Sequence, residues 1–283
     1  MARKLFCQYG PVCYAISLAK ERALRRLRDL AGGEDFAREV RAESLPYIVM
    51  AHRSPILRQL QGVEMSLQEN KRVNLSLAAP GLDGLLLRPG QTLSFWRRVG
   101  NPTRRRGFLP GLTIAGGKPS QGVGGGLCQL ANLLHWMTLQ SPLTVTELHH
   151  HTDAIFPDSG RRVPFGTGTS VFFPGADYRV RNDTEDLYQY RVWLDGDSLC
   201  GELRCSRPPA VRLRIRERDH HYRREADGCW YRCSEIWRLA LDAATGEPLG
   251  EELVFRNHSK VLFDPALIPP DQIRAGRSRL SGP

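Results

Sequence analysis

Glycine fills four of the five positions before Leu127 in the segment GVGGGLCQLANLLHW, residues 122–136. Because such a run costs backbone entropy on folding, it indicates a place where another group must come close to the main chain. Apolar residues then recur at helical spacing as far as Gln140. The segment therefore predicts a glycine-rich loop that leads directly into a buried helix, with Cys128 in its first turn.

The remaining patterns predict an α+β fold. Leucines recur at helical spacing between residues 15 and 30, with arginines between them, and a second helical piece is expected at 35–43. Apolar residues alternate with arginine over 211–216, which is typical of a strand with one face in water. Three regions are expected: a helical N-terminal region at 1–75, a core domain at 76–200 whose glycine-rich loop and buried helix pack on an antiparallel sheet, and a β-rich C-terminal extension at 201–283.

The charge balance bears on the kind of partner. Lys and Arg number 40 against 30 Asp and Glu, which gives a formal net charge of +10. This excess suits an anionic partner such as nucleic acid, a phosphorylated metabolite or an acidic lipid surface. A solvated arginine-rich surface explains the same excess without any partner, so charge alone leaves both interpretations open.

Location is predicted from the first thirty residues and from the cysteines. The chain has no apolar run of about 18 residues, so no membrane-spanning helix is expected. The start is basic, but no small-residue cleavage site follows before Lys20, and we predict a mature cytoplasmic N-terminus. The basic amphipathic helix there leaves open a peripheral contact with a membrane surface. Seven scattered cysteines, an odd number, indicate reduced thiols.

Cys128 is the candidate nucleophile. The unpaired N–H groups and partial positive charge at a helix N-terminus lower the pKa of a thiol placed there. Adjacent glycines would admit a substrate carbonyl to the main chain, where N–H groups form an oxyanion hole. Gln129 supplies a further side-chain donor. The expected ligand-binding residues are therefore Gly124, Gly125, Gly126 and Gln129.

A general base is expected on the strand that follows the helix. That strand ends in His149-His150-His151, and alternation along a strand places the first and third of these histidines on one face. Asp158, or alternatively Asp153, would orient the histidine. A cysteine at a helix start, then a strand with histidine, then an acid, is the order of elements in papain-like cysteine hydrolases and transglutaminases. The expected catalytic set is Cys128, His151, Asp158 and His149.

Three other interpretations compete with a catalytic cysteine. Cys128 is also explained as a small buried residue without reactivity. His149 and His151 would form a metal site if Cys128 or Asp153 supplied a third ligand. Neither this arrangement nor a four-thiolate zinc site has the spacing of a known zinc motif, so no metal and no cofactor is predicted. The four thiolates of that zinc alternative would be Cys200, Cys205, Cys229 and Cys233.

Four sequence blocks within residues 88–184 resemble the VanW family. In chain order they are RPGQTLSFWRRVGNPTRRRGF, GVGGGLCQLANLLHWMTLQSPLTVTELHHH, FPDSGRRVPFGTGTSVFF and YRVRNDT. Short family members, without the export signal and accessory wall domains of longer relatives, are also similar at both ends. There the matching stretches are LPYIVMAHRSPILRQLQGVEM before the core, and RERDHHYR and SEIWRLALDAATGEPLGEELVF after it.

The resemblance implies a cell-envelope role, because the founding member of the family is encoded in a glycopeptide-resistance cluster. Within the family pattern the block Gly-Gly-Gly-x-Cys-Gln matches residues 124–129, the most secure histidine match is His151, and Asp158 lies in the matching block FPDSGR. Position 149 is histidine in some relatives and aromatic in others. The cysteines of the zinc alternative do not belong to the pattern.

Two hypotheses of different class follow. The first is a cysteine-dependent acyl-transfer or amide-hydrolysing enzyme that acts on a peptidoglycan-like peptide or precursor, with Cys128 as nucleophile, His151 as base and Asp158 as the residue that orients it. The second is a non-catalytic binding or scaffold protein of envelope metabolism, in which the glycine loop and basic loops hold an anionic ligand. In both, the expected partner is a peptidoglycan precursor or another anionic ligand, and nucleic acid is not expected.

Overall fold

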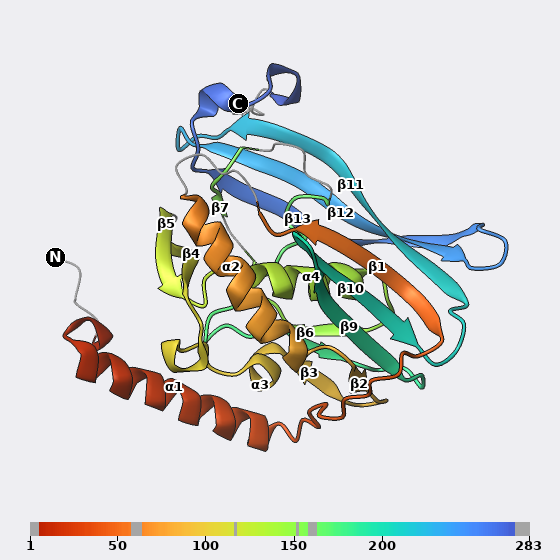
Figure 1. Ribbon diagram of the computed structural model, residues 1–283. Helices are drawn as coiled ribbons and strands as arrows, with labels where there is room; N and C mark the ends of the chain where they lie inside the picture. Colours follow the sequence, from red (N-terminus) through yellow and green to blue (C-terminus); the bar gives the residue numbers. More distant parts are fainter. Residues whose placement is uncertain (1–5, 58–63, 116–117, 151–152, 158–162, 275–283) are drawn as a thin grey trace.

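The computed structural model describes residues 6–57, 64–115, 118–150, 153–157 and 163–274. Within these residues, helices cover one side of several antiparallel sheets (Figure 1). The helices are α1 (Pro11–Ala31), α2 (Met65–Ala78), α3 (Phe95–Val99) and α4 (Cys128–Leu139), and the short 3-10 turns are η1 (Phe6–Gln8), η2 (Ala79–Gly81), η3 (Arg104–Arg106), η4 (Pro265–Leu267) and η5 (Pro270–Gln272). The α+β class expected from the sequence is confirmed.

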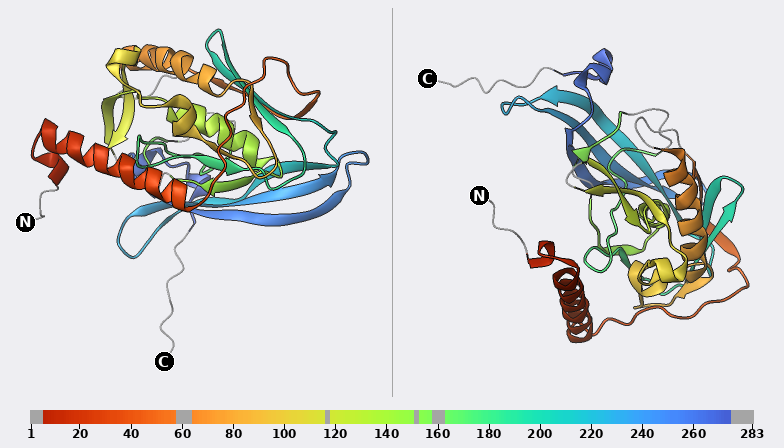
Figure 2. Two further views of the ribbon diagram at one scale, coloured as in Figure 1. Left: turned by 90° about the horizontal axis from the view of Figure 1, so that it is seen from below. Right: turned by 60° about the vertical axis from the view of Figure 1, so that its left-hand side comes forward.

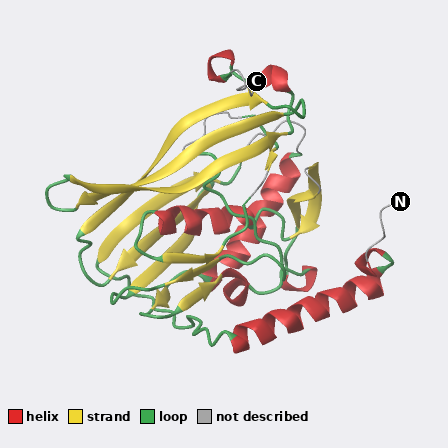
Figure 3. Cartoon of the chain, turned by 180° about the vertical axis from the view of Figure 1, so that it is seen from behind, coloured by secondary structure: helices red, strands yellow, loops and turns green. Residues whose placement is uncertain are grey.

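The described strands form four sheets (Figure 3). In spatial order the first sheet contains β1 (Tyr47–Pro55), β10 (Ser198–Cys205), β9 (Tyr188–Asp195) and β2 (Leu85–Leu87). The second contains β11 (Val211–Arg224), β12 (Trp230–Asp242), β13 (Pro248–Val261) and β7 (Asp153–Ala154), the last of these parallel to its neighbour. The others are β3 (Thr92–Ser94), β8 (Arg179–Arg181) and β6 (Thr144–Glu147), and the hairpin of β4 (Pro110–Ala115) and β5 (Lys118–Val123).

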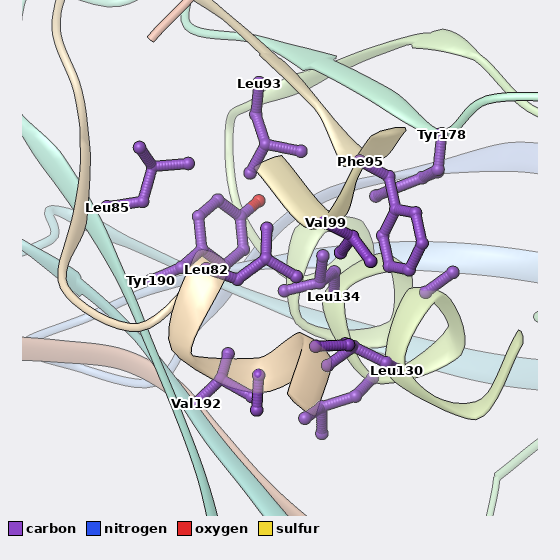
Figure 4. Close-up of a cluster of buried hydrophobic side chains, with 14 of the residues drawn as sticks. Leu82, Leu85, Leu93, Phe95, Val99, Leu130, Leu134, Tyr178, Tyr190 and Val192 are labelled. Atoms are coloured by element: carbon purple, nitrogen blue, oxygen red, sulfur yellow. The ribbon is translucent and has the colours of Figure 1, made fainter. Parts of the chain in front are cut away.

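The predicted buried helix after the glycine loop is α4. Its apolar side chains pack against the first sheet and α3, and Figure 4 shows Leu130 and Leu134 within this core. Gly201 on β10 allows the close approach, because a Cβ atom there would lie 2.9 Å from Leu133 and 3.0 Å from Met137. The glycine loop therefore enters a helix whose position is fixed by the main core.

The prediction of a helix at 35–43 is wrong. This stretch is extended, and its backbone bonds to β2 and β3 instead of to itself: Ala37 N–H donates to the Thr92 carbonyl at 2.9 Å, and Leu86 N–H donates to the Glu39 carbonyl at 2.9 Å. Here the partners of the backbone come from distant parts of the chain.

The first sheet joins segments that are far apart in the sequence. β1, from the N-terminal region, pairs along its length with β10, whose last residue is Cys205. The long strands β11, β12 and β13 confirm the β-rich character expected after residue 201.

α1 runs along the outside of the body (Figures 1 and 2). None of the helices among the described residues combines the length and the apolar character needed to cross a membrane.

Candidate functional site

A cleft of about 900 Å³ borders the glycine-rich loop. Its walls come from α2, the end of β1, the β4–β5 hairpin, the first turns of α4, the segment around residues 163–173 and the inner side of α1. This volume lies within the range of small-molecule sites. The lining residues include Gln68, Lys71, Gly124, Cys128, Gln129 and Trp136. The structure thus brings the predicted loop, cysteine and glutamine to one cavity.

The glycines let the chain approach itself. A Cβ atom on Gly111 would lie 2.5 Å from the carbonyl oxygen of Gly125, so the loop and the β4–β5 hairpin touch backbone to backbone. Gly126 has a φ of +92°, and a Cβ atom there would lie 2.7 Å from the Cδ of Lys71. At these two loop positions the close approach predicted from the sequence is made by groups of the protein.

Asn74 of α2 holds this contact in place. Its side-chain amide donates to the carbonyl oxygens of Leu109 at 3.0 Å and Gly125 at 2.9 Å, and its Oδ1 accepts from the Leu109 N–H at 2.8 Å. The side chain is fully buried. Every one of these contacts is with main chain, so Asn74 fixes the loop and the hairpin relative to α2.

Two further polar side chains of α2 share the buried face of Asn74. Gln68, Lys71 and Asn74 stand three residues apart and are all buried. Sequence reasoning did not identify them. The signal was present, because these polar residues recur at helical spacing together with the apolar Leu67 and Leu75. Gln68 and Lys71 line the cleft.

Cys128 is partly buried at the first residue of α4. Its thiol donates to the carbonyl oxygen of Val171 at 3.7 Å, a bond that only the protonated form makes. Burial raises the pKa of the Cys128 thiol. The helix N-terminus was expected to lower this pKa, and the desolvation of the sulfur outweighs that effect.

Gln129 ties α4 to β1. Its side-chain amide donates to the Ser54 hydroxyl at 3.0 Å and to the Pro55 carbonyl at 2.9 Å. These two bonds occupy the N–H donors that were expected to face a substrate. The observed contacts give Gln129 a clear role in positioning the first turn of α4.

The predicted histidines are placed differently from one another. His149 forms a 2.9 Å contact with Glu147 and is not among the described residues that line the cleft. His150 lies against the ring of Phe255, and burial lowers its pKa. His151 and Asp158 lie outside the described residues. The proposed pairing of Cys128 with these two groups therefore stays a prediction.

One histidine that the sequence did not single out does line the cleft. His52 on β1 packs edge to face on Trp136 of α4, with ring centroids 6.0 Å apart. The two rings give this end of the cleft an aromatic wall.

No group of three or more metal-binding side chains (His, Cys, Asp or Glu) gathers in the part of the chain that the structure describes. Asp153, the alternative acid, lies in β7 beside Lys260 of β13.

All seven cysteines are described, and none forms a disulfide. The four cysteines of the zinc alternative divide between two sheets. Cys200 and Cys205 lie on β10 of the first sheet, whereas Cys229 directly precedes β12 of the second sheet and Cys233 lies within that strand.

A network of buried charges stands next to a second cavity of about 400 Å³, between α1 and the core. Arg179 of β8 bonds Asp177 at 3.0 Å and Asp29 of α1 at 2.8 Å, and all three side chains are buried. Burial alone would raise the pKa of Glu147, but hydrogen bonds from Arg25 and His149 outweigh it and lower the pKa to about 2. The network attaches α1 to β6 and β8.

Taken together, the fold and the cleft define an α+β protein with a glycine-loop site, and comparison with known proteins adds its family. A family model described as VanW like protein matches residues 70–204. Vancomycin B-type resistance protein VanW of Enterococcus faecalis is 33% identical over 267 residues, which cover 93% of this chain and 95% of that protein. The chain belongs to the VanW family.

A second relative matches over a shorter stretch. The uncharacterized protein YoaR of Bacillus subtilis is 30% identical over 149 residues, which cover 53% of this chain and 48% of that protein. No solved structure gives a significant match to the chain.

Proposed function

We propose that this chain binds a peptidoglycan-like peptide or precursor in the glycine-loop cleft, as a protein of cell-envelope metabolism in a glycopeptide-resistance setting. The setting is supported by the name of the Enterococcus faecalis relative, a vancomycin B-type resistance protein. The binding role is supported by a cleft of about 900 Å³ whose floor is held rigidly by Asn74 and the glycine loop.

The observation that carries this proposal is the amide oxygen of Gln68. The side chain is 2% exposed and lines the cleft, and its Oε1 accepts no hydrogen bond from the residues that the structure describes. A buried acceptor without a donor costs about 1–3 kcal/mol. A ligand N–H that enters the cleft removes this cost, and a peptide offers such donors along its main chain. Lys71 adds a positive charge to the same wall, which suits a carboxylate or phosphate.

The experiment is a calorimetric titration with a soluble muramyl pentapeptide. Gln68→Met keeps the size of the side chain and removes the acceptor, so we expect its Kd to rise about tenfold relative to wild type. Gln272→Met on η5, away from the cleft, is the matched control and should bind as wild type does. A wild type that binds no muramyl peptide, or a Gln68→Met variant with unchanged affinity, would contradict the proposal.

A cysteine-dependent acyl-transfer or amide-hydrolysing enzyme is the second candidate. It is favoured by the position of Cys128, which lines the cleft at the first residue of α4. In this mechanism the Cys128 thiol gives its proton to His151, which Asp158 orients, and the sulfur attacks the substrate carbonyl. The C–N bond breaks and the amine leaves with that proton, and water or an acceptor amine then cleaves the thioester. Among the described residues the Cys128 thiol donates to the Val171 carbonyl and its burial raises its pKa, so this candidate is placed second.

Iodoacetamide labelling of Cys128 separates the two candidates. The binding role predicts slow labelling with an apparent pKa above the usual value of about 8.5, unchanged in His151→Ala. Fast labelling near neutral pH that is lost in His151→Ala would establish an activated thiolate and favour the enzyme.

A further inference from the structure

The N-terminal helix α1 turns its charged side toward the protein. Arg25 pairs with Glu147 and also donates to the Gly175 carbonyl at 2.8 Å. Asp29, four residues further along, accepts from Arg97 at 2.8 Å and belongs to the buried network around Arg179. Polar contacts, rather than an apolar seam, therefore hold this part of α1 to the body.

The apolar side chains of α1 lie on the opposite side. We call Val12, Ile16, Ala23, Leu27 and Leu30 the outer stripe. At 100° per residue these five positions fall within an arc of about 60°. All five are exposed, and the exposed fraction of the four larger side chains runs from 53% at Ile16 to 71% at Val12 and 77% at Leu30. Figure 2 shows one side of α1 facing away from the rest of the chain.

This orientation is the reverse of that in an ordinary surface helix, which places its apolar face against the core and its charges in water. A contiguous apolar stripe left in water is unfavourable and marks a surface that meets another apolar phase. Because the inner side of α1 is already engaged with β6, β8 and Arg97, rotation of the helix would break the buried ion pairs. The outer stripe must therefore find its apolar partner outside the described chain.

The charges around the stripe indicate the nature of that partner. α1 carries five cationic side chains against two acidic ones, and one of the two acids, Asp29, is turned inward and paired. At 100° per residue, Lys20 lies about 20° outside one edge of the outer stripe and Arg26 about 40° outside the other edge, and both side chains are exposed. Long cationic side chains beside an apolar stripe can reach anionic headgroups while the stripe enters the acyl boundary.

We propose that the outer stripe of α1 lies in the surface of an anionic phospholipid bilayer. The stripe supplies buried apolar area and the flanking cations supply electrostatic attraction, which are the two contributions to interfacial helix binding. Tyr14 and Leu18, on the opposite side of the same helix, line the glycine-loop cleft. Adsorption through α1 therefore brings that cleft close to the lipid surface. The proposal does not depend on which ligand the cleft binds.

Vesicle co-sedimentation of the full chain tests the proposal. We expect the wild type to sediment with vesicles of phosphatidylglycerol and phosphatidylcholine, to bind pure phosphatidylcholine poorly, and to be released by high salt. In Leu27→Gln/Leu30→Gln the partition coefficient should fall at least about tenfold, because two apolar anchors are lost. Val12→Gln/Ile16→Gln tests the other end of the stripe in the same way.

Leu249→Gln/Leu267→Gln is the matched control, because these leucines on β13 and η4 are also exposed, at 58% and 50%. It should partition as the wild type does, and circular dichroism should show unchanged helix content in every variant. A wild type that does not bind anionic vesicles, or stripe variants that bind equally well, would overturn the proposal. A dimer that depends on the stripe in sedimentation velocity, without vesicle binding, would overturn it in favour of a second copy of the chain.

Discussion

Gly125 and Gly111 touch backbone to backbone, and neither position has room for a Cβ atom. A Cβ atom on Gly125 would overlap the carbonyl group of Gly111, and backbone on both sides cannot move aside as a flexible side chain can. Gly125→Ala should therefore lower the free energy of unfolding by about 3 kcal/mol. Urea denaturation, followed by tryptophan fluorescence, measures this change.

The matched control for that substitution is Gly250→Ala. Gly250 lies in β13, and a Cβ atom there meets nothing within 4 Å. We expect a change in the free energy of unfolding of no more than about 0.5 kcal/mol. Equal stability of the two variants would show that the glycine loop is not packed as described.

Arg179 is expected to be the most sensitive member of the buried charge network. Arg179→Met removes the buried cation that Asp177 and Asp29 share, which leaves Asp29 with Arg97 and Asp177 with Ser94 as side-chain partners, and we expect a cost of about 3 kcal/mol. Arg181→Met on the same strand breaks only an exposed pair with Asp183 and should cost less than about 1 kcal/mol. Thermal unfolding of both variants compares the two sites, and similar midpoints would refute the role given to the network.

His135 should make the protein sensitive to acid. Burial lowers the pKa of His135 to about 3, with a smaller contribution from His150, whereas an unfolded histidine titrates near 6.5. Below the pKa of His135 in the unfolded chain, the unfolded chain takes up a proton that the folded chain does not. The free energy of unfolding therefore decreases as the pH is lowered. From about pH 7 to about pH 4 this group alone should remove about 3 kcal/mol.

The variant His135→Leu tests that assignment. It abolishes the titration, and Tyr178 keeps its 2.9 Å hydrogen bond to Thr138. Urea denaturation across the acid range should therefore show a shallower loss of stability in the variant than in wild type. Parallel pH profiles would show that another group is responsible for the acid sensitivity.

The successes and failures of sequence-based prediction in this fold have a common physical basis. The buried helix α4 was predictable, because its apolar residues recur at local spacing and the glycine run marks its start. The stretch 35–43 was not, because its backbone groups bond to residues near 85 and 92, which local periodicity cannot indicate. For α1 the sequence predicted an amphipathic basic helix, but the side that faces the body depends on ion pairs with β6 and β8.

The candidate site shows the same division. Cys128 and Gln129 line the cleft next to the glycine loop, and their catalytic and ligand-binding roles stay predictions. The sequence did not predict the sign of the shift in the pKa of Cys128, because desolvation depends on how the segment around Val171 covers the sulfur. Gln68 was missed because a polar residue on a helix is usually solvated, and its burial follows only from the packing of α2.

Protection of Cys128 by ligand tests most directly that the glycine-loop cleft is the binding site. The rate of Cys128 alkylation is measured by peptide mass spectrometry with and without saturating muramyl pentapeptide, and Cys229, near the start of β12 and away from the cleft, serves as the internal reference. The account predicts that the ligand slows labelling of Cys128 and leaves that of Cys229 unchanged. Equal rates for Cys128 with and without ligand would contradict it.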